Sequence, residues 1–278
     1  MGSMYIKNLE KNYGKKKVLN GLTYEFTHGI YGILGPNGAG KTTLMKCILG
    51  LEKYEGSIEI DKKEKMGYLP QNFSLFCQLK VMEAMEYIAI LKKAGTDNLN
   101  EILEMVNLGQ EKNTKIKNLS GGMLRRFGIA QALVGNPDIL IIDEPTVGLD
   151  PKERVRFRNL LAQIQGERVI LLSSHIVEDM EAVCDEILII KDGRIIISGN
   201  KEDLIHSMAG KIVECEVKKT ELGNYRNYNA TSITYSGENA LVRFVGDHLP
   251  AGEEKVATLE DVYFYYAGES DGQKENLG

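Results

Sequence analysis

GPNGAGKTT, residues 35–43, is the stretch that decides the fold of this chain. It fits the pattern G-x-x-x-x-G-K-[ST] and lies between a predicted strand at residues 29–35 and the helical sequence TLMKCILG. Glycines in such a loop let main-chain amides turn toward a phosphate at a helix N-terminus, where the helix dipole favours an anion. The pattern predicts that Lys41 reaches the β and γ phosphates of a nucleotide and that the Thr42 hydroxyl holds Mg²⁺. Taken alone, the same motif also fits a plain glycine turn before a helix.

Short apolar runs that alternate with helical patterns surround this loop. The runs are rich in Ile, Leu and Val, which is typical of strands buried on both faces of a parallel sheet covered by helices. They lie at residues 29–35, 139–143, 168–174 and 186–193. Together with the loop, they predict an α/β fold with a P-loop NTPase core.

Two other regions depart from this alternation. Between about residues 72 and 134 the strand signal disappears, and VMEAMEYIAILKKA (81–94) and NLNEILEMVNLG (98–109) carry apolar residues at three and four spacing, which predicts an inserted helical subdomain. After Gly210, KIVECEVKK alternates, and TSITYSGENALVRFVG predicts two strands joined by a turn at residues 237–239.

We therefore expect a small β-rich accessory unit after the main domain. TLEDVYFYYAG (258–268) resembles a closing helix, and the polar end of the chain is typical of disorder. The predicted organisation is a main domain at 4–210, an accessory unit at 211–267 and a disordered tail at 268–278.

Charge and cysteine usage limit the class of protein. The net charge of -5 is spread over both signs, so no basic footprint for nucleic acid is present. The cysteines, Cys47, Cys77, Cys184 and Cys215, are scattered without metal-ligand spacing, which favours a reducing compartment. No window approaches the roughly 18 consecutive apolar residues of a membrane helix, and no signal peptide is recognisable. We expect an intracellular protein.

An acidic pair follows one of the predicted buried strands, in ILIIDEP (139–145). Such a pair is often no more than a solvated loop. Downstream of a P-loop, however, an acid at a strand end is expected to bind the Mg²⁺ shell, and Asp143 fits that role. Glu144, one residue later, can then polarise the water that attacks the γ-phosphate.

The ordered set of motifs resembles the nucleotide-binding subunit of an ATP-binding cassette (ABC) transporter. Five elements occur in that family's order over about residues 4–205: GPNGAGKT, GYLPQN with Gln71, LSGGM, ILIIDEP followed by GLD, and LLSSHIVEDME with His175. His175 alone could be a core histidine, and Gln71 alone a surface strand end; only the ordered set favours a functional role for them. The sequence departs from the family pattern at Met123, where a glutamine is usual.

The resemblance implies a shared site. In the family, two cassettes pack head to tail, and the Ser-Gly-Gly loop of each closes over the γ-phosphate of the other. Gln71 resembles the residue that senses Mg²⁺ and the attacking water, and His175 resembles a switch histidine at the γ-phosphate. Asp150 resembles a loop residue that links the two sites. Tyr13 resembles the aromatic residue that stacks on adenine. The catalytic residues implied are Glu144, His175, Lys41 and Gln71, and the metal-binding residues Thr42, Gln71 and Asp143. The nucleotide-binding residues implied are Tyr13, Gly35, Pro36, Asn37, Gly38, Ala39, Gly40, Lys41, Thr42, Thr43, Ser120, Gly121, Gly122 and Asp150.

The resemblance also implies partners, a location and further parts of the fold. ATP and Mg²⁺ are the expected cofactors, and the partners are a second cassette and a separate multi-span permease, whose coupling helix would dock near residues 71–79. The chain would then lie in the cytoplasm at the inner face of the membrane, with an antiparallel β part at its N-terminus. The ending LEDVYFYYAGE is similar to that of bacterial cassettes that partner exporters of drugs, antimicrobial peptides or sodium. The alternative is a single-cassette ATPase that drives a soluble assembly such as iron-sulfur cluster loading.

Overall fold

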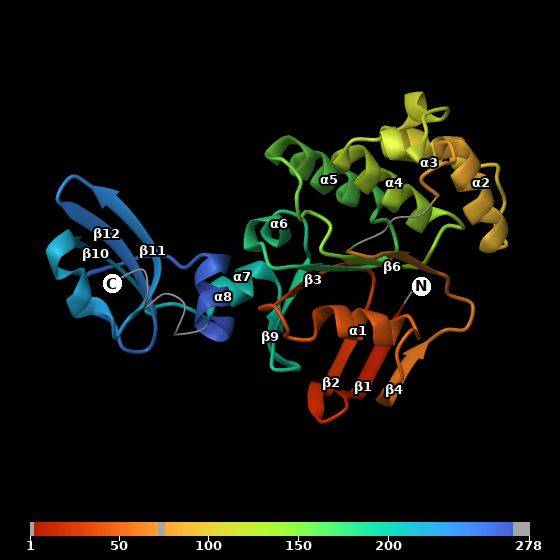
Figure 1. Cartoon of the computed structure of the whole chain (residues 1–278). Helices are drawn as coiled ribbons and strands as arrows, with labels where there is room; N and C mark the ends of the chain where they lie inside the picture. The colour runs from red at the N-terminus through yellow and green to blue at the C-terminus, as the bar shows by residue number, and fades with distance from the viewer. Residues whose placement is uncertain (1–2, 72–75, 269–278) are drawn as a thin grey trace.

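A mostly parallel sheet runs through the middle of the protein, seen edge-on in Figure 1. The computed structural model describes residues 3–71 and 76–268. Within these ranges the sheet has six strands in the order β5-β6-β7-β3-β8-β9, all parallel except β9, which runs antiparallel to β8. The strands are β3 (Gly29–Leu34), β5 (Met66–Leu69), β6 (Ile139–Asp143), β7 (Val169–Ser174), β8 (Glu186–Lys191) and β9 (Arg194–Gly199). The four strands predicted from apolar runs are confirmed, and so is the α/β class.

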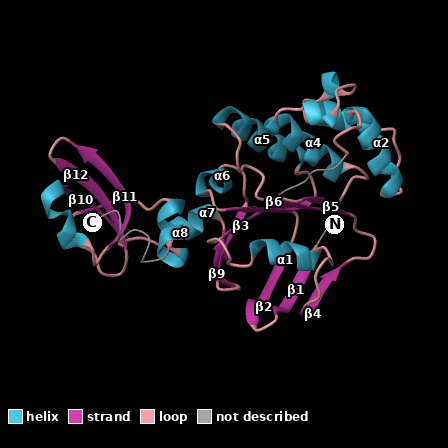
Figure 2. Ribbon diagram, in the orientation of Figure 1, coloured by secondary structure: helices cyan, strands magenta, loops and turns pink. Residues whose placement is uncertain are grey.

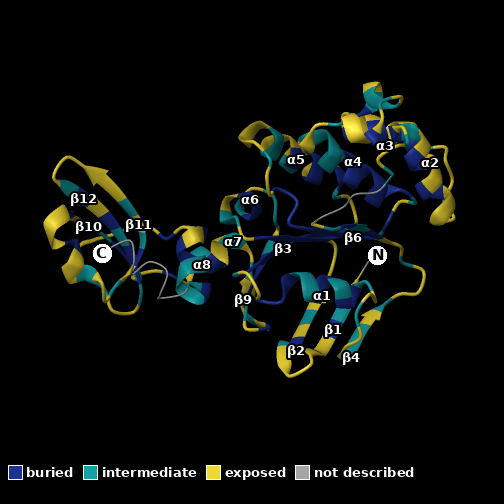
Figure 3. Ribbon diagram, viewed as in Figure 1, coloured by how far each residue is buried: buried dark blue, intermediate teal, exposed yellow. Residues whose placement is uncertain are grey.

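The apolar runs are continuous because the central strands have no solvent-facing side. Every residue of β3, β6 and β7 is buried, and these strands form the dark centre of Figure 3. Since the strands are parallel, their carboxyl ends meet at one edge of the sheet. The P-loop after β3, Asp143 at the end of β6 and the serines at the end of β7 therefore gather there.

An antiparallel sheet lies below the central one in Figure 2 and covers one side of it. It has the order β2-β1-β4, with β1 at Met4–Tyr13, β2 at Lys16–Phe26 and β4 at Glu55–Ile60. Helix α1 (Lys41–Ile48) lies between the two sheets, and its buried residues share an apolar cluster with both. This is the expected N-terminal antiparallel part.

Helices cover the opposite face of the central sheet (Figure 2). They are α2 (Val81–Leu91), α3 (Leu99–Met105), α4 (Gly121–Leu133) and α5 (Pro151–Ile164). The helices predicted at 81–94 and 98–109 are confirmed with slightly shorter bounds. Residues 72–75, at the start of the predicted helical subdomain, lie outside the described residues, so that boundary stays a prediction. In the described ranges no helix combines the length and the low polarity of a membrane span.

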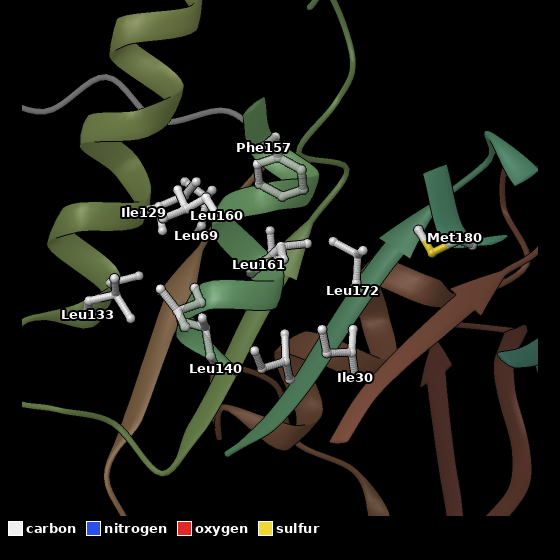
Figure 4. Packing of buried hydrophobic residues seen from close by; sticks show 14 of the residues in the cluster. Ile30, Leu69, Ile129, Leu133, Leu140, Phe157, Leu160, Leu161, Leu172 and Met180 are labelled. Carbon is white, nitrogen blue, oxygen red and sulfur yellow. The ribbon is translucent and has the colours of Figure 1, made fainter. Parts of the chain in front are cut away.

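Figure 4 shows how this helical layer is anchored to the sheet. Phe157, Leu160 and Leu161 of α5 pack with Leu140 and Leu172 from two neighbouring strands in one buried cluster. Burying each such side chain stabilises the fold by about 1.5–3 kcal/mol. The helix that follows Asp150 is therefore held firmly over the strand that ends at Asp143.

The C-terminal region forms a second, smaller sheet beside the main body (Figure 1). Its order is β11-β12-β10-β13, and its strands are β10 (Ile212–Lys218), β11 (Asn229–Ser236), β12 (Asn239–Val245) and β13 (Glu253–Glu254). The predicted hairpin is present, with Gly237 in the turn at φ 56°. The sheet has an apolar cluster of its own that includes Val242 and Phe244.

The predicted closing helix, α8 (Leu259–Ala267), joins the main body and not the small sheet alone. It packs against α6 (Val177–Glu181), α7 (Lys201–His206) and β8, and its Leu259 and Val262 belong to the apolar cluster of the main domain. The region predicted as one unit at 211–267 thus divides between two packing environments, and its boundaries stay a prediction. The predicted tail lies outside the described residues apart from Gly268.

Candidate functional site

The P-loop forms a cavity of about 220 Å³ at the carboxyl edge of the sheet. Gly40 precedes α1 with φ 105°, and a Cβ there would lie 2.9 Å from the Val18 carbonyl oxygen, so only glycine fits this position. No side chain caps the N-terminus of α1, which leaves its amides free to face an anion. The cavity is smaller than the roughly 300–1,000 Å³ of a typical small-molecule pocket, so it encloses only part of a nucleotide. Its lining residues are Lys16, Val18, Asn37, Gly38, Ala39, Gly40, Lys41, Thr42 and Thr43.

Lys41 is buried between the loop and the acidic pair. Its Nζ donates to the carbonyl oxygens of Gly35 at 2.6 Å and Pro36 at 3.2 Å, and lies 3.7 Å from Glu144 Oε1. Burial lowers the pKa of Lys41, and the carboxylates of Glu144 and Asp143 act in the opposite direction. The structure thus brings the predicted phosphate-binding lysine and both predicted acids into one site.

Asp143 lies buried beside the P-loop threonine, with one carboxylate oxygen unpartnered among the described residues. It is 1% exposed, and its Oδ1 accepts hydrogen bonds from Ser173 Oγ at 2.6 Å and Thr42 Oγ1 at 3.2 Å. Its Oδ2 is buried without a partner among the described residues. An orphaned carboxylate oxygen beside a hydroxyl fits hydrated Mg²⁺, a cation that prefers oxygen ligands. Thr42 and Asp143 are therefore the residues that would hold the ion.

Glu144 adopts a left-handed backbone conformation, with φ 47°, which is strained for a residue other than glycine. Its N–H donates to Ser173 Oγ at 3.0 Å, and its carbonyl accepts from the guanidinium of Arg125. Its buried carboxylate approaches Lys41 through Oε1 and His175 Nδ1 through Oε2, the latter at 2.8 Å. His175 and Glu144, predicted from separate motifs, are therefore in direct contact.

Three predicted site residues lie farther out. Gln71 is exposed just after β5, and the hydrogen bond that the structure records for it is through its carbonyl, from Arg125 Nη1 at 2.8 Å. Asp150 caps the N-terminus of α5 by accepting from Glu153 N at 2.8 Å. Tyr13 is 44% exposed, with Lys11 Nζ 4.7 Å from the centre of its ring. The metal role of Gln71 and the adenine role of Tyr13 stay predictions.

The signature loop does not line the P-loop cavity. Ser120 caps α4 by accepting from Met123 N at 3.2 Å. A Cβ on Gly122 would lie 2.7 Å from Cδ of Glu153, the end of a flexible side chain that could move aside. A Cβ on Gly121 would meet nothing within 4 Å, so the described chain supplies no reason for glycine there.

Sequence reasoning missed residues that hold the site together. Ser173 contacts both Asp143 and Glu144, Arg125 contacts the carbonyl of Glu144, and Lys16 and Val18 line the cavity. Ser173 lies inside the motif LLSSHIVEDME and Arg125 lies two residues after LSGGM, yet neither pattern indicates a contact with a neighbouring loop. The strand β2 that carries Lys16 and Val18 has no phosphate-binding pattern of its own.

Comparison with known proteins yields consistent matches. The model of the family described as ABC transporter matches residues 19–147. The Nod factor export ATP-binding protein I of Burkholderia orbicola is 38% identical over 224 residues, which is 73% of each chain. The linearmycin resistance ATP-binding protein LnrL of Bacillus subtilis is 34% identical over 224 residues, 74% of this chain and 72% of that protein. A solved ATP-binding subunit of an ABC transporter superposes with a TM-score of 0.66 at 26% identity, covering 73% of this chain and 92% of the other.

Proposed function

Because the chain belongs to the ABC transporter family as an ATP-binding subunit, we propose that it drives a separate membrane permease, and that the transport is export. The chain is an ATPase of this family. The observation that carries the proposal is the buried site in which Lys41, Asp143 and Glu144 meet beside the P-loop cavity. That arrangement is suited to phosphoryl transfer, where catalysis consists of positioning and charge stabilisation.

Each residue has a distinct part in hydrolysis. The α1 amides and Lys41 bind the β and γ phosphates, for which Lys41 exchanges its present bonds to the loop carbonyls. Thr42 and Asp143 would hold Mg²⁺, which when bound would neutralise charge on the phosphates. Glu144 accepts the proton of the attacking water, and His175, 2.8 Å from its Oε2, orients that carboxylate. Gln71 would contribute an oxygen ligand to the metal shell.

The signature loop acts on the nucleotide of a second cassette, which is this chain or a related one. Gly121 is exposed at the start of α4 and has open space around its Cβ position, as expected if a phosphate of the partner approaches it. The small P-loop cavity also leaves part of the nucleotide to be covered by another surface. ATP therefore favours a head-to-tail dimer, and loss of the γ-phosphate favours its opening.

The export assignment rests on the relatives. The Burkholderia protein is named for Nod factor export and the Bacillus protein for linearmycin resistance. We infer the same direction of transport here, with the chain at the cytoplasmic face of the membrane, bound to its permease. The proposed docking region around residues 71–79 includes residues 72–75, which lie outside the described ranges.

The first test is a purification of tagged Glu144→Gln protein from detergent-solubilised cells of the source organism. This variant should bind ATP and hydrolyse it about 10²- to 10⁴-fold more slowly, which holds the closed state. We expect a multi-span membrane protein to co-purify with ATP and less of it with ADP. Lys41→Ala, which should not bind nucleotide firmly, is the matched control.

Recovery of soluble proteins alone would refute the permease assignment and favour the assembly ATPase, such as one for iron-sulfur cluster loading. A wild-type hydrolysis rate in Glu144→Gln would refute the general-base role, whatever co-purifies. The co-purifying proteins therefore test the assignment of the partner, and the hydrolysis rate independently tests the role of Glu144.

A further inference from the structure

Arg125 lies on α4, which begins next to Ser120, but its guanidinium contacts the loops that carry Glu144 and Gln71. Its Nε donates to the Pro145 carbonyl at 2.7 Å, and its Nη1 donates to the Gln71 carbonyl at 2.8 Å. Its Nη2 donates to the carbonyl of Glu144, and longer contacts of 3.4 Å reach the carbonyls of Pro70 and Asp143. One side chain thus joins three segments that are far apart in the sequence.

The form of these contacts is unusual for an arginine beside two acids. Within the described chain, Arg125 donates its hydrogen bonds to main-chain carbonyls, although the Asp143 and Glu144 carboxylates lie close enough to affect its pKa. Burial lowers the pKa of Arg125, and those two carboxylates oppose the shift. The planar arginine side chain has five N–H donors and can bond several carbonyls at once, whereas a lysine ammonium has only three donors on one atom. The Arg125 cation therefore holds backbone carbonyls and leaves the carboxylates of Asp143 and Glu144 to their other partners.

The backbone that it fixes is strained. A non-glycine residue in a left-handed conformation costs of order 1–3 kcal/mol and persists only where its surroundings hold it. The peptide groups of Glu144 are held by Ser173 at the N–H and by Arg125 at the carbonyl. Without Arg125, Glu144 could relax to an ordinary conformation, and its carboxylate would move away from the position between Lys41 and His175.

We propose that Arg125 is a positioning residue for ATP hydrolysis: by holding the carbonyls of Glu144, Pro145 and Gln71 it aims the Glu144 carboxylate and ties the signature helix to the hydrolytic site of its own chain. This rests on the proposed role of Glu144 as general base. A movement of α4 is then transmitted to Glu144 and to the backbone at Gln71 together.

The neighbouring Arg126 is a matched control. It is also half-buried on α4 and also donates to carbonyls, those of Val106 at 3.1 Å and Asn107 at 2.7 Å, but these lie in the helical layer. Its Nε lies 3.4 Å from Glu153 Oε2. Arg126→Gln therefore removes the same charge and similar hydrogen bonds without touching the loop of Glu144.

The experiment measures kcat and KM for ATP, nucleotide affinity without turnover, and Tm, for the full chain and its variants. Arg125→Gln should lower kcat about 10- to 100-fold, the effect expected of a misplaced catalytic group, with ATP affinity essentially unchanged. Arg125→Lys should give an intermediate kcat, because one ammonium can hold only part of the carbonyl array. Arg126→Gln should lower Tm at least as much as Arg125→Gln does, with little change in kcat.

A double-variant cycle with Glu144→Gln decides how Arg125 acts. If it works through Glu144, adding Arg125→Gln to Glu144→Gln leaves the residual rate nearly unchanged. An equal loss in both backgrounds, a wild-type kcat in Arg125→Gln, or a loss confined to ATP affinity would overturn the proposal. If Arg125→Gln does not fold, Arg125→Lys decides the question: a wild-type kcat overturns the proposal, and an intermediate kcat supports it. A fast Glu144→Gln would instead refute the general-base role, and the positioning role with it.

Discussion

Asp261→Asn is expected to loosen the junction between the small C-terminal sheet and the main domain. Asp261 lies on α8, which packs against the main body, and is 1% exposed. From β12, Arg243 donates to both carboxylate oxygens, with Nε at 3.1 Å from each and Nη2 at 2.7 Å from Oδ2. The N–H and hydroxyl of Thr258 donate at 2.8 and 2.9 Å, and Thr231 Oγ1 donates at 3.0 Å.

The expected loss of stability in Asp261→Asn comes from the Arg243 charge that remains after its partner is neutralised. Arg243, with its side chain 14% exposed, keeps only Glu214 at 2.9 Å as a charged partner among the described contacts. Removing one member of a buried ion pair costs about 3–5 kcal/mol. At about 2–4 °C per kcal/mol for a chain of this size, Tm should fall by about 6–20 °C.

The same pair predicts a dependence on pH. Burial raises the pKa of Asp261, but hydrogen bonds from Arg243 and Thr258 outweigh it, so the folded pKa is below the ordinary value. A depressed pKa contributes stability that is present above the unfolded pKa of about 3.9 and is lost as pH falls through the folded pKa. The wild-type protein should lose this contribution in acid, and Asp261→Asn should lack it at every pH.

Differential scanning calorimetry at neutral pH and in acid tests both points, with Glu260→Gln as the control. Glu260 is the adjacent acid on α8 and is largely exposed; partial desolvation of its carboxyl, together with the nearby acids Asp261, Glu178 and Glu181, raises its pKa. Neutralising it should leave Tm unchanged or higher. Equal shifts in the two variants, or a loss below about 1 kcal/mol in Asp261→Asn, would refute the junction as described.

Two predictions concern the nucleotide site. Gly121→Ala should keep or raise the Tm of the monomer, because alanine is favoured over glycine in helices by up to about 1 kcal/mol. The same variant should abolish the ATP-induced dimer, as measured by light scattering. A dimer of unchanged affinity would contradict the shared site. Ser173→Ala removes the 2.6 Å donor to Asp143 and the acceptor for the Glu144 N–H, so it should cost about 1–3 kcal/mol of stability and raise the Mg²⁺ concentration needed for ATP hydrolysis. The control is Ser174→Ala, which removes a hydroxyl that accepts a hydrogen bond from Ile176 N. If both variants needed the same Mg²⁺ concentration for ATP hydrolysis, the role of Ser173 would be contradicted.

Much of the fold follows from local patterns. The central strands could be predicted because burial on both faces demands uninterrupted apolar residues, as in ILIID at 139–143. The helices at 81–91 and 99–105 could be predicted because one buried side repeats every three or four residues. The placement of α8 could not, since its sequence shows an apolar helix but not which of two surfaces it covers.

The residues of the site also fall into two groups, those that the sequence predicts and those that it does not. Residues that bind a nucleotide or a metal are restricted in type, so Lys41 and Asp143 could be proposed from the P-loop motif together with the acid at a following strand end. A main-chain carbonyl or N–H can be held by many side chains, so the partners of a strained backbone leave no pattern. Ser173 and Arg125 belong to this second group, and only the contacts identify them.

This difference has a physical consequence for Glu144, the proposed general base. Its φ of 47° is not set by its own sequence, because neither Glu144 nor the following proline favours that conformation. The conformation must be imposed from outside, at the N–H by a residue of β7 and at the carbonyl by a residue of α4. Since α4 begins at the loop proposed to meet a partner's nucleotide, a displacement of that helix would act directly on one of the two hydrogen bonds that hold the backbone of Glu144.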